Sequence, residues 1–599
     1  MNGWQGKSIW IDLSDERVKE VRIPEEWYKE YLGGTGVGIR IIWEYMKHDI
    51  SPYDPENLLI FAVGPLTGTE VYGAGRHSVI SVSPLTNTIF DSTSGGFFGA
   101  YMKFAGIDNL IITGKAESPK VLRIFEDEVE FLDGQEYWGK DTYQTTKELR
   151  KRLGSKYRVA TIGPAGENLV RYASIINDPV HAAGRGGLGA VMGSKNLKAI
   201  AIGGAIKPKI GDKHRLDKLL KNMRIRITWN PILGRALPEF GTASLLNLIN
   251  ELGMLPTKNF ERGTFDAAEE ISGESLKEQV LKKRKSCYNC PIACKRVTET
   301  EHKKGDGPEY ESIVNLGSMV LLNDISKITE LNYLCNELGL DTISMGGTLA
   351  CALELSEIGA MNRKLDWGDY DKLVEAIKEV AANKSELGKD LALGSKELSI
   401  KYKHPEVSVQ VKGLEMPAYD PRGAMGMALT YGTSYRGACH LRSWTISFEV
   451  LGVPNLIDRF SIVEKPSLVA YTQNLSMVYD SLVMCQHYGS EFDEEPLADI
   501  LSAVVGIEYT QADLITIGER IWNLARLMNI KRGFGYNDDL LPPKIMQPLK
   551  EGPSAGVVPP YEDMLKQYYE VRGWTPQGIP KEETLKRLGL YNLEGKFNE

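Results

Sequence analysis

Three closely spaced cysteines are the residues of this sequence best suited to chemistry. Cys287, Cys290 and Cys294 follow the spacing C-x2-C-x3-C, and Pro291 comes directly after the second one. Thiolates this close in sequence can converge on one metal centre only if the backbone loops around it. Four sulfur ligands suit zinc or an iron–sulfur cluster, so the triplet needs a fourth ligand from elsewhere. Cys485 is the best candidate for that ligand, and spacing alone leaves a structural zinc site open.

The other cysteines, Cys335, Cys351 and Cys439, are isolated in the sequence, and we expect them to be small buried hydrophobic residues. Seven cysteines is a low and odd number, which does not fit the disulfide framework of a secreted protein. We therefore expect a reducing compartment, the cytoplasm, with thiols that bind metal or stay free.

A glycine-rich segment at residues 184–189 matches the pattern G-x-G-x-x-G of dinucleotide-binding loops. Its context argues against that function, because residues 177–181 before it do not have the pattern of a strand. A strand-like run at 199–202 also follows soon after, where dinucleotide binding requires a full helix. A phosphate-bearing ligand of another kind remains compatible, since backbone amides and Arg185 make a good anion cradle.

The composition limits the partners of the chain. Its 599 residues carry a net charge of −8 and form no basic stripe of the kind that nucleic-acid binding needs. No stretch reaches the ~18 apolar residues of a membrane span, and the first residues lack the pattern of a signal peptide. The basic run at 282–285 is typical of a solvated surface, although its place before the cysteines leaves a docking role open.

The elements that must position these residues change in character along the chain. Short apolar runs bounded by glycine-rich turns predict strands at 8–13, 57–62, 109–113 and 198–202. Helical spacing dominates after residue 212, for example at 328–338 and 370–384. We expect an α+β fold with a β-rich domain over residues 1–206. Two mainly α-helical domains would follow, 207–410 with the cysteine triplet and 411–599 with Cys485.

Several short segments occur in an order that is typical of one enzyme family. Besides the cysteine triplet, they are 33–36 (Gly-Gly-Thr-Gly), 73–76 (Gly-Ala-Gly-Arg), 91–96 (Asp-Ser-Thr-Ser-Gly-Gly), 182–197, 307–311 (Gly-Pro-Glu-Tyr-Glu), 337–341 (Glu-Leu-Gly-Leu-Asp) and 417–423 (Pro-Ala-Tyr-Asp-Pro-Arg-Gly). In this order the chain resembles the aldehyde:ferredoxin oxidoreductase family of tungstopterin enzymes. The resemblance covers most of the chain, from residue 33 to about Cys485.

The resemblance implies a tungsten or molybdenum bis-pterin cofactor, a [4Fe-4S] cluster and magnesium, at the interface of the β-rich and helical domains. The cluster would be bound by Cys287, Cys290, Cys294 and Cys485, and Arg76 would bridge it to a pterin. The pterin phosphates would lie on the turn of Thr93, Ser94, Gly95 and Gly96 and on the loop of Ala183, Gly184 and Arg185. Magnesium would be bound by the backbone carbonyls of Thr93 and Ala183.

Two further segments resemble the pterin clamps of the family, which follow the pattern Asp-x-x-Gly-Leu-Cys/Asp. In the first, 336–341, Asn336 replaces the leading Asp. In the second, 480–485, Val483 and Met484 replace Gly-Leu. The resemblance implies pterin contacts by Asn336, Leu340, Asp341, Arg442, Asp480, Met484 and Gln486.

The activity implied by the resemblance is oxidation of an aldehyde to a carboxylic acid. Glu311 would be the general base toward the attacking water, with Glu309 as the alternative carboxylate. His440 would donate to the substrate carbonyl and polarise it, and Tyr419 could add a second donor.

Electrons would pass through the cluster to ferredoxin or to a small multi-cluster iron–sulfur subunit. Some relatives bind a metal on a dimer axis through Glu-x-x-His, but residues 330–333 read Glu-Leu-Asn-Tyr here. This change leaves both a homodimer and a heteromer open. The alternatives are an aromatic acyl-CoA ring reductase subunit of the same family and a zinc-stapled binding protein without turnover.

Overall fold

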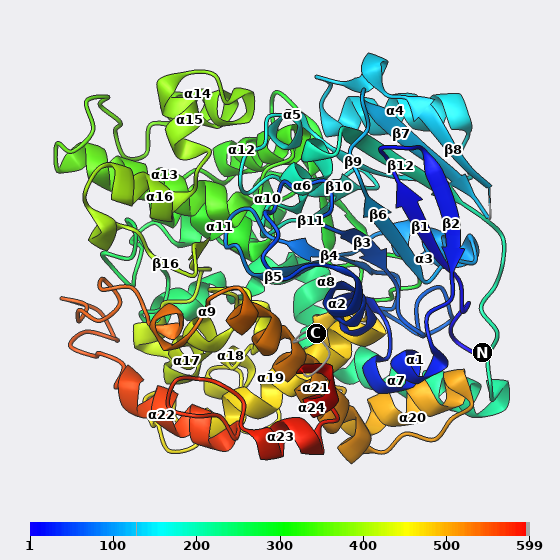
Figure 1. Ribbon diagram of the computed structural model, residues 1–599. Coiled ribbons are helices and arrows are strands. Elements are labelled where there is room, and N and C mark those ends of the chain that lie inside the picture. The colour runs from blue at the N-terminus through cyan, green and yellow to red at the C-terminus, as the bar shows by residue number, and fades with distance from the viewer. Residues whose placement is uncertain (127, 595–599) are drawn as a thin grey trace.

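The N-terminal third of the chain forms two mixed sheets, and the rest is mainly helical. This computed structural model describes residues 1–126 and 128–594. Figure 1 shows the sheets on one side of the molecule, α11–α16 beside them, and α17–α24 below both. The arrangement confirms the predicted α+β class. We propose the expected residues 206 and 410 as domain boundaries.

The first sheet has the strand order β2-β1-β6-β3-β4-β5. Its strands are β1 (Ser8–Asp12), β2 (Arg17–Val21), β3 (Leu59–Ala62), β4 (His77–Val82), β5 (Ile89–Ser94) and β6 (Asn109–Thr113). All neighbours pair antiparallel except β1 and β6, which are parallel. The predicted strand at 109–113 is confirmed without a shift, and those at 8–13 and 57–62 are confirmed as slightly shorter elements.

The second sheet has the order β11-β10-β9-β12-β7-β8. Its strands are β7 (Lys120–Phe125), β8 (Glu128–Asp133), β9 (Arg158–Ile162), β10 (Ile175–Asn177), β11 (His181–Ala183) and β12 (Leu197–Gly203). The helices of this part are α1 (Glu25–Tyr31), α2 (Gly34–Tyr45), α3 (Phe98–Phe104), α4 (Thr142–Leu153), α5 (Pro164–Glu167) and α6 (Leu188–Ser194). One buried apolar core joins both sheets with α3 and α6.

The context of the glycine-rich segment 184–189 differs from the expectation. The short strand β11 precedes it, so the expectation that no strand comes before it was wrong. After it come only the seven-residue helix α6 and then β12, which includes the predicted strand-like run at 199–202. Three residues are too few to show the alternation of a strand in the sequence. Because β11 pairs antiparallel with β10 and α6 has only seven residues, the segment still does not form the parallel strand–helix unit of a dinucleotide site.

The helical part contains a three-stranded sheet, β13 (Leu281–Lys285), β14 (Lys295–Glu299) and β15 (Lys304–Asp306), and a hairpin of β16 (Gln410–Val411) and β17 (Leu414–Glu415). Its first helices are α7 (Lys213–Trp229), α8 (Leu237–Phe240), α9 (Leu246–Glu251), α10 (Gly273–Gln279), α11 (Tyr310–Leu316), α12 (Ile325–Leu338), α13 (Thr342–Glu357), α14 (Tyr370–Ala382), α15 (Glu386–Leu391) and α16 (Ser395–Lys401). The later helices are α17 (Met425–Thr433), α18 (Ile446–Glu449), α19 (Lys465–Leu482), α20 (Glu494–Val505), α21 (Gln511–Lys531), α22 (Tyr561–Val571), α23 (Glu582–Arg587) and α24 (Tyr591–Glu594). Within residues 1–126 and 128–594, no helix is long and apolar enough to cross a membrane.

Two glycines let the start of α2 and the loop after β3 approach the end of α19 closely. A Cβ atom on Gly34, whose φ is +43°, would lie 2.6 Å from the carbonyl oxygen of Asp480. A Cβ atom on Gly64 would clash with the carbonyl of Leu482. Glycine is therefore required at both positions, and the contact fixes the last turn of α19, just before Cys485.

Buried ion pairs also stabilise this contact with the end of α19. The Arg442 guanidinium donates to the carboxylates of Asp91 on β5 and Asp480 on α19, and all three side chains are buried. Burial alone would raise the pKa of Asp91, but Arg442 and Arg436 outweigh it and hold that pKa below its ordinary value. Arg442 therefore links three segments that are far apart in the sequence.

We expect Arg442→Met to destabilise the fold by about 3–5 kcal/mol, because it leaves two carboxylates buried without their cation. Denaturant unfolding followed by circular dichroism would measure the change. The control is Arg587→Met, whose ion pair with Glu519 has an exposed arginine side chain and should be worth at most about 1 kcal/mol. Equal small losses in both variants would contradict the role of Arg442.

Candidate active site

The three cysteines of the triplet lie on the loop that joins β13 to β14. The two strands pair antiparallel up to Lys285 and Lys295, and residues 286–294 form the loop between them. The loop curls back on itself, since Asn289 and Ala293 have left-handed backbone conformations and the Cys290 amide donates to the Cys287 carbonyl at 3.2 Å. The strands thus fix both ends of the loop while the loop gathers its thiols.

Cys485 approaches the cysteine loop from the end of α19. Its backbone amide donates to the carbonyl of Gly73 at 3.0 Å. Burial raises the pKa of Cys294 well above its ordinary value, and the nearby thiols of Cys485, Cys287 and Cys290 raise it further. The four thiols therefore lie within electrostatic reach of one another. Among residues 1–126 and 128–594, no three His, Cys, Asp or Glu side chains are grouped to bind a single metal ion.

Arg76 lies between the cysteines and β5. Its guanidinium donates to the backbone carbonyl of Thr93 at 3.1 Å and to the Thr93 hydroxyl at 3.2 Å. The same charge opposes the rise that burial causes in the pKa of Cys485. A Cβ atom on Gly95 would lie 3.0 Å from the Cys287 sulfur, so the glycine turn packs directly on the cysteine loop.

The second glycine of this turn is held by Asp178. Gly96 has φ +91°, and a Cβ atom there would lie 2.7 Å from an Asp178 carboxylate oxygen. Asp178 also accepts hydrogen bonds from the amides of Phe97 and Phe98, and Ser94 donates to Asn177 at 2.6 Å. These contacts leave room for glycine alone at position 96 and fix the turn at the end of β5.

The loop after β11 connects the sheets with both helical segments. Ser174 donates to the carbonyl of Gly184 at 2.9 Å. Arg185 donates to the carbonyl of Ala438 at 2.8 Å and to that of Glu415 at 2.5 Å, and its Nε lies 3.4 Å from Asp341. The buried Ala183 ends β11 directly before this loop.

The first clamp segment spans the junction of α12 and α13. Asp341 caps the N-terminus of α13 and accepts from the amides of Ile343 and Ser344. Asn336 lies in the last turn of α12, and Leu340 forms an isolated bridge with Ala173 of the N-terminal part.

The second clamp segment ends α19. Gln486 donates to Asp480 at 2.9 Å, and Met484 is buried with its amide bonded to the Tyr479 carbonyl at 2.9 Å. With Arg442 paired to Asp480, both clamp segments therefore lie against the N-terminal sheets.

Glu311 and His440 come together from different segments. Glu311 lies in the first turn of α11, and one carboxylate oxygen accepts from the Ala418 amide at 3.0 Å. The other oxygen has no hydrogen-bond partner and lies 3.6 Å from Nε2 of His440. Burial raises the pKa of Glu311 to about 7, whereas burial together with Arg185 lowers that of His440 well below 6.5.

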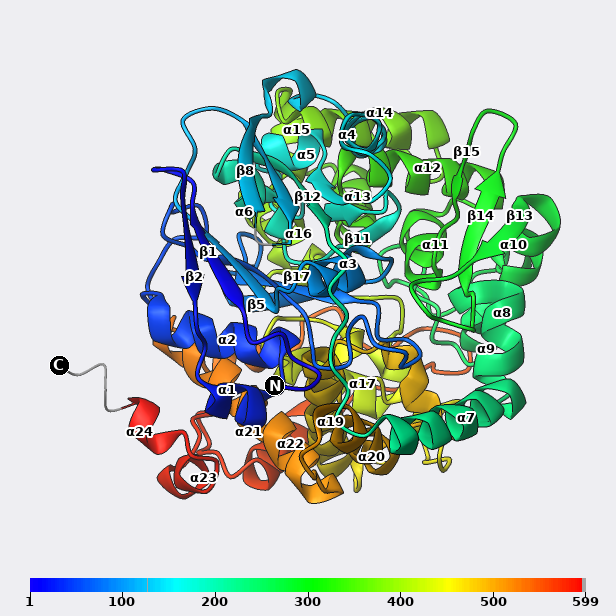
Figure 2. The ribbon, with the colours of Figure 1, turned by 90° about the vertical axis from the view of Figure 1, so that its right-hand side faces the viewer.

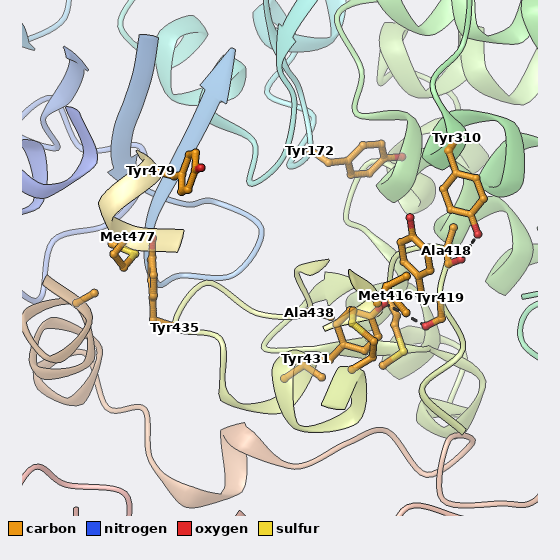
Figure 3. Close-up of a cluster of buried hydrophobic side chains, with 14 of the residues drawn as sticks. Tyr172, Tyr310, Met416, Ala418, Tyr419, Tyr431, Tyr435, Ala438, Met477 and Tyr479 are labelled. Atoms are coloured by element: carbon orange, nitrogen blue, oxygen red, sulfur yellow. Dashed lines mark hydrogen bonds between the residues drawn. The ribbon is translucent and has the colours of Figure 1, made fainter. Parts of the chain in front are cut away.

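Aromatic rings surround this pair. Tyr419 stacks on Tyr310 at 5.1 Å between ring centroids and lies 6.0 Å from the His440 ring and 6.4 Å from Trp444. Figure 3 shows the Tyr310 hydroxyl directed at the Ala418 carbonyl and the Tyr431 hydroxyl at that of Tyr419. These contacts hold the segment that presents the Ala418 amide to Glu311.

Glu309, the alternative carboxylate, points away from His440. It accepts from the Thr242 hydroxyl at 2.7 Å and lies 3.4 Å from the Lys295 ammonium, beside the cysteine loop. Burial alone would raise the pKa of Glu309, but Lys295 outweighs it and the pKa lies below its ordinary value. The geometry therefore favours Glu311 over Glu309 as the partner of His440.

Sequence reasoning missed Asp91 and Arg436. Asp91 accepts from Tyr435 and Thr35 as well as from Arg442, and Arg436 donates to its backbone carbonyl. Asp91 begins the segment 91–96, one of those that carry the family resemblance, and this could have marked it. No motif marks Arg436.

Glu330 of the Glu-Leu-Asn-Tyr segment accepts from the Tyr370 hydroxyl at 2.6 Å.

Known proteins resemble the whole chain. The family model for the N-terminal domain of aldehyde ferredoxin oxidoreductase matches residues 8–204, and the model for its domains 2 and 3 matches 218–590. A tungsten-containing aldehyde ferredoxin oxidoreductase from Pyrococcus furiosus is 43% identical over 98% of this chain and 99% of its own, and one from Thermococcus kodakarensis is 42% identical over the same shares.

The solved structure of the active-site complex of benzoyl coenzyme A reductase with 1,5-dienoyl-CoA shares the fold. It has a TM-score of 0.86 and 24% identity, and the match covers 100% of this chain and 98% of that one. Together, the family models and the full-length relatives show that the chain belongs to the aldehyde ferredoxin oxidoreductase family and is an oxidoreductase.

Proposed function

We propose that the protein oxidises aldehydes to carboxylic acids at a tungsten centre, or molybdenum in its place, bound by two pterins. The observation that carries the proposal is the pair of Glu311 and His440, whose side chains are only 14% and 12% exposed and whose facing atoms lie 3.6 Å apart beside aromatic rings. Full-length relatives at 42–43% identity are named for aldehyde oxidation. The likeness to the benzoyl coenzyme A reductase complex supports the fold alone.

The reaction takes one aldehyde and one water to one carboxylic acid, two protons and two electrons. The bound metal would accept the two electrons. Glu311 would take a proton from the attacking water, because its pKa of about 7 keeps a basic carboxylate available near neutrality. The carboxylate oxygen without a hydrogen-bond partner is the atom free to do so.

His440 would bind and polarise the carbonyl oxygen of the substrate. Its lowered pKa keeps the imidazole neutral at pH 7, so it donates a hydrogen bond while carrying no charge that would pair with Glu311. Tyr419 would supply a second hydroxyl donor, since burial raises its pKa well above the ordinary value. The surrounding rings would keep bulk water away from the pair.

Buried polar groups without protein partners fit a polar cofactor beside this pair. The Nε atoms of Arg436 and Arg442, whose charges act on His440, have no hydrogen-bond partner among the described residues. Arg442, Asp480, Met484 and Gln486 would bind one pterin, and Asn336, Leu340 and Asp341 the other. The phosphates would lie on the turn of Ser94, Gly95 and Gly96 and on the loop of Gly184 and Arg185, and magnesium on the carbonyls of Thr93 and Ala183.

The four thiols would bind a [4Fe-4S] cluster that releases the electrons one at a time to ferredoxin or a small iron–sulfur subunit. Arg76, which touches Thr93 and acts on the pKa of Cys485, would connect the cluster with the pterin. Cysteines as thiols suit the reducing cytoplasm. The chain would act as a homodimer or as one subunit of a heteromer.

Cys485→Ala tests the fourth ligand. We expect purified protein to lose the visible absorbance of the cluster and most of its iron, because three thiolates leave one iron without a protein ligand. Cys351→Ala, which removes a buried thiol elsewhere in the chain, should keep both. Unchanged iron and absorbance in the Cys485 variant would place the fourth ligand elsewhere.

Glu311→Gln tests the general base. We expect turnover of benzaldehyde or crotonaldehyde to fall about 10²–10⁴-fold with metal and iron content retained. In the unchanged protein, kcat should rise with pH through about 7, because the base works only after its carboxyl loses a proton.

This rise of kcat with pH should be absent from the residual activity of Glu311→Gln and present in Glu309→Gln. If kcat still rises through pH 7 in Glu311→Gln, Glu311 is not the general base. Reduction of benzoyl-CoA with no aldehyde activity would favour the ring reductase instead.

A further inference from the structure

We propose that a ring of basic side chains around the cysteine loop is the docking surface for an acidic electron-carrier protein. The basic collar consists of Arg158, Lys207, Lys282, Lys283, Arg284 and Lys285. The inference rests on the proposed function, in which electrons leave through the four cysteines.

One side of the collar is the edge strand β13. Its residues 282–285 are all exposed, and the strand runs through Ser286 directly into Cys287. The segment 281–306 contains eight Lys or Arg and three Asp or Glu, in a chain whose net charge is −8. A local positive excess therefore lies where the chain reaches the thiols.

Local carboxylates neutralise these charges only in part. The ammonium of Lys285 lies 3.5 Å from Asp306, and that of Lys282 lies 3.8 Å from Glu299, both at or beyond hydrogen-bond range. No ion pair of Lys283 occurs in the part of the chain that the structure describes. The strand therefore presents net positive charge to solvent.

The other side of the collar comes from the N-terminal part. Tyr288 of the cysteine loop packs edge-on against Phe104 at 5.8 Å and Phe97 at 6.4 Å. The Arg158 guanidinium lies 4.7 Å from the centroid of Phe97, and the Lys207 ammonium 4.1 Å from that of Phe104. Both cations thus lie on the rings that touch the cysteine loop.

The tip of the loop lies between the two sides. Asn289 is exposed and its side-chain amide donates to the backbone carbonyl of Glu70, while Cys287 and Cys290 on either side of it are half-buried. Figure 2 shows β13 and β14 at the edge of the molecule, away from α22. A partner seated on this edge would therefore cover the loop that carries the thiols.

Charge complementarity selects an acidic partner. A positive patch steers a negatively charged protein into the right orientation and raises its association rate by about 10–10³-fold at low salt. Lysines also protect edge strands from pairing with other chains, a role that needs no partner. Arg158 and Lys207 lie outside β13, so protection of that edge does not account for them.

The test uses the holoenzyme and an acidic low-potential bacterial ferredoxin. The variant Lys207→Glu/Lys283→Glu reverses one charge on each side of the collar. Lys550→Glu/Lys566→Glu, two exposed lysines of the C-terminal part, makes the same net change elsewhere. Each ferredoxin rate is divided by the rate with saturating benzyl viologen, so that any change in aldehyde chemistry cancels. The Kd for oxidised ferredoxin is measured separately.

We expect the collar variant to lose at least about tenfold in normalised kcat/KM for ferredoxin, and to weaken Kd similarly, at low salt. The difference should vanish near 1 M salt, where the Debye length is about 3 Å. The control variant should stay within about twofold of the unchanged protein.

Equal ferredoxin kinetics and Kd in both variants would overturn the docking surface, as would a wild-type association rate without salt dependence. The proposal would also be overturned if the collar variant lost binding to a DNA oligonucleotide but still bound ferredoxin as the unchanged protein does. If no aldehyde reduces either acceptor, the proposed function fails, and the Kd values still decide the docking surface.

Discussion

The close contact of α2 and the loop after β3 with the end of α19 is the constraint on which the rest of the structure depends. Gly34 and Gly64 permit it because any side chain there would meet the backbone of α19. Arg442 then closes it by neutralising two buried carboxylates, one from each side. Without this contact, Cys485 would not reach the loop of the other cysteines.

Burial at the same interface sets the chemistry of the polar side chains. Desolvation penalises charge, so it raises the pKa of Glu311 and lowers that of His440. These opposite shifts from one cause leave His440 neutral and let Glu311 exchange its proton near pH 7. The Glu311 carboxylate can then take a proton from water while the facing imidazole carries no charge, so no ion pair has to separate first.

The sequence predicts local features better than distant contacts. The cysteine spacing requires only a tight loop, and the apolar run at 109–113 becomes β6 without a shift. The pairing of Arg442 with Asp91 joins residues 351 positions apart and has no local signature. The strand β11 was missed because it is three residues long and cannot show an alternating pattern. The roles of the site residues come from the family resemblance and stay proposals.

Glu309 and Glu311 show why position along a helix matters more than residue type. Glu309 precedes α11 in extended conformation and reaches Lys295 beside the cysteine loop. Glu311 lies within the first turn, which rotates its side chain toward Ala418 and His440. The N-terminus of one short helix therefore separates the proposed site of proton transfer from the proposed exit of electrons.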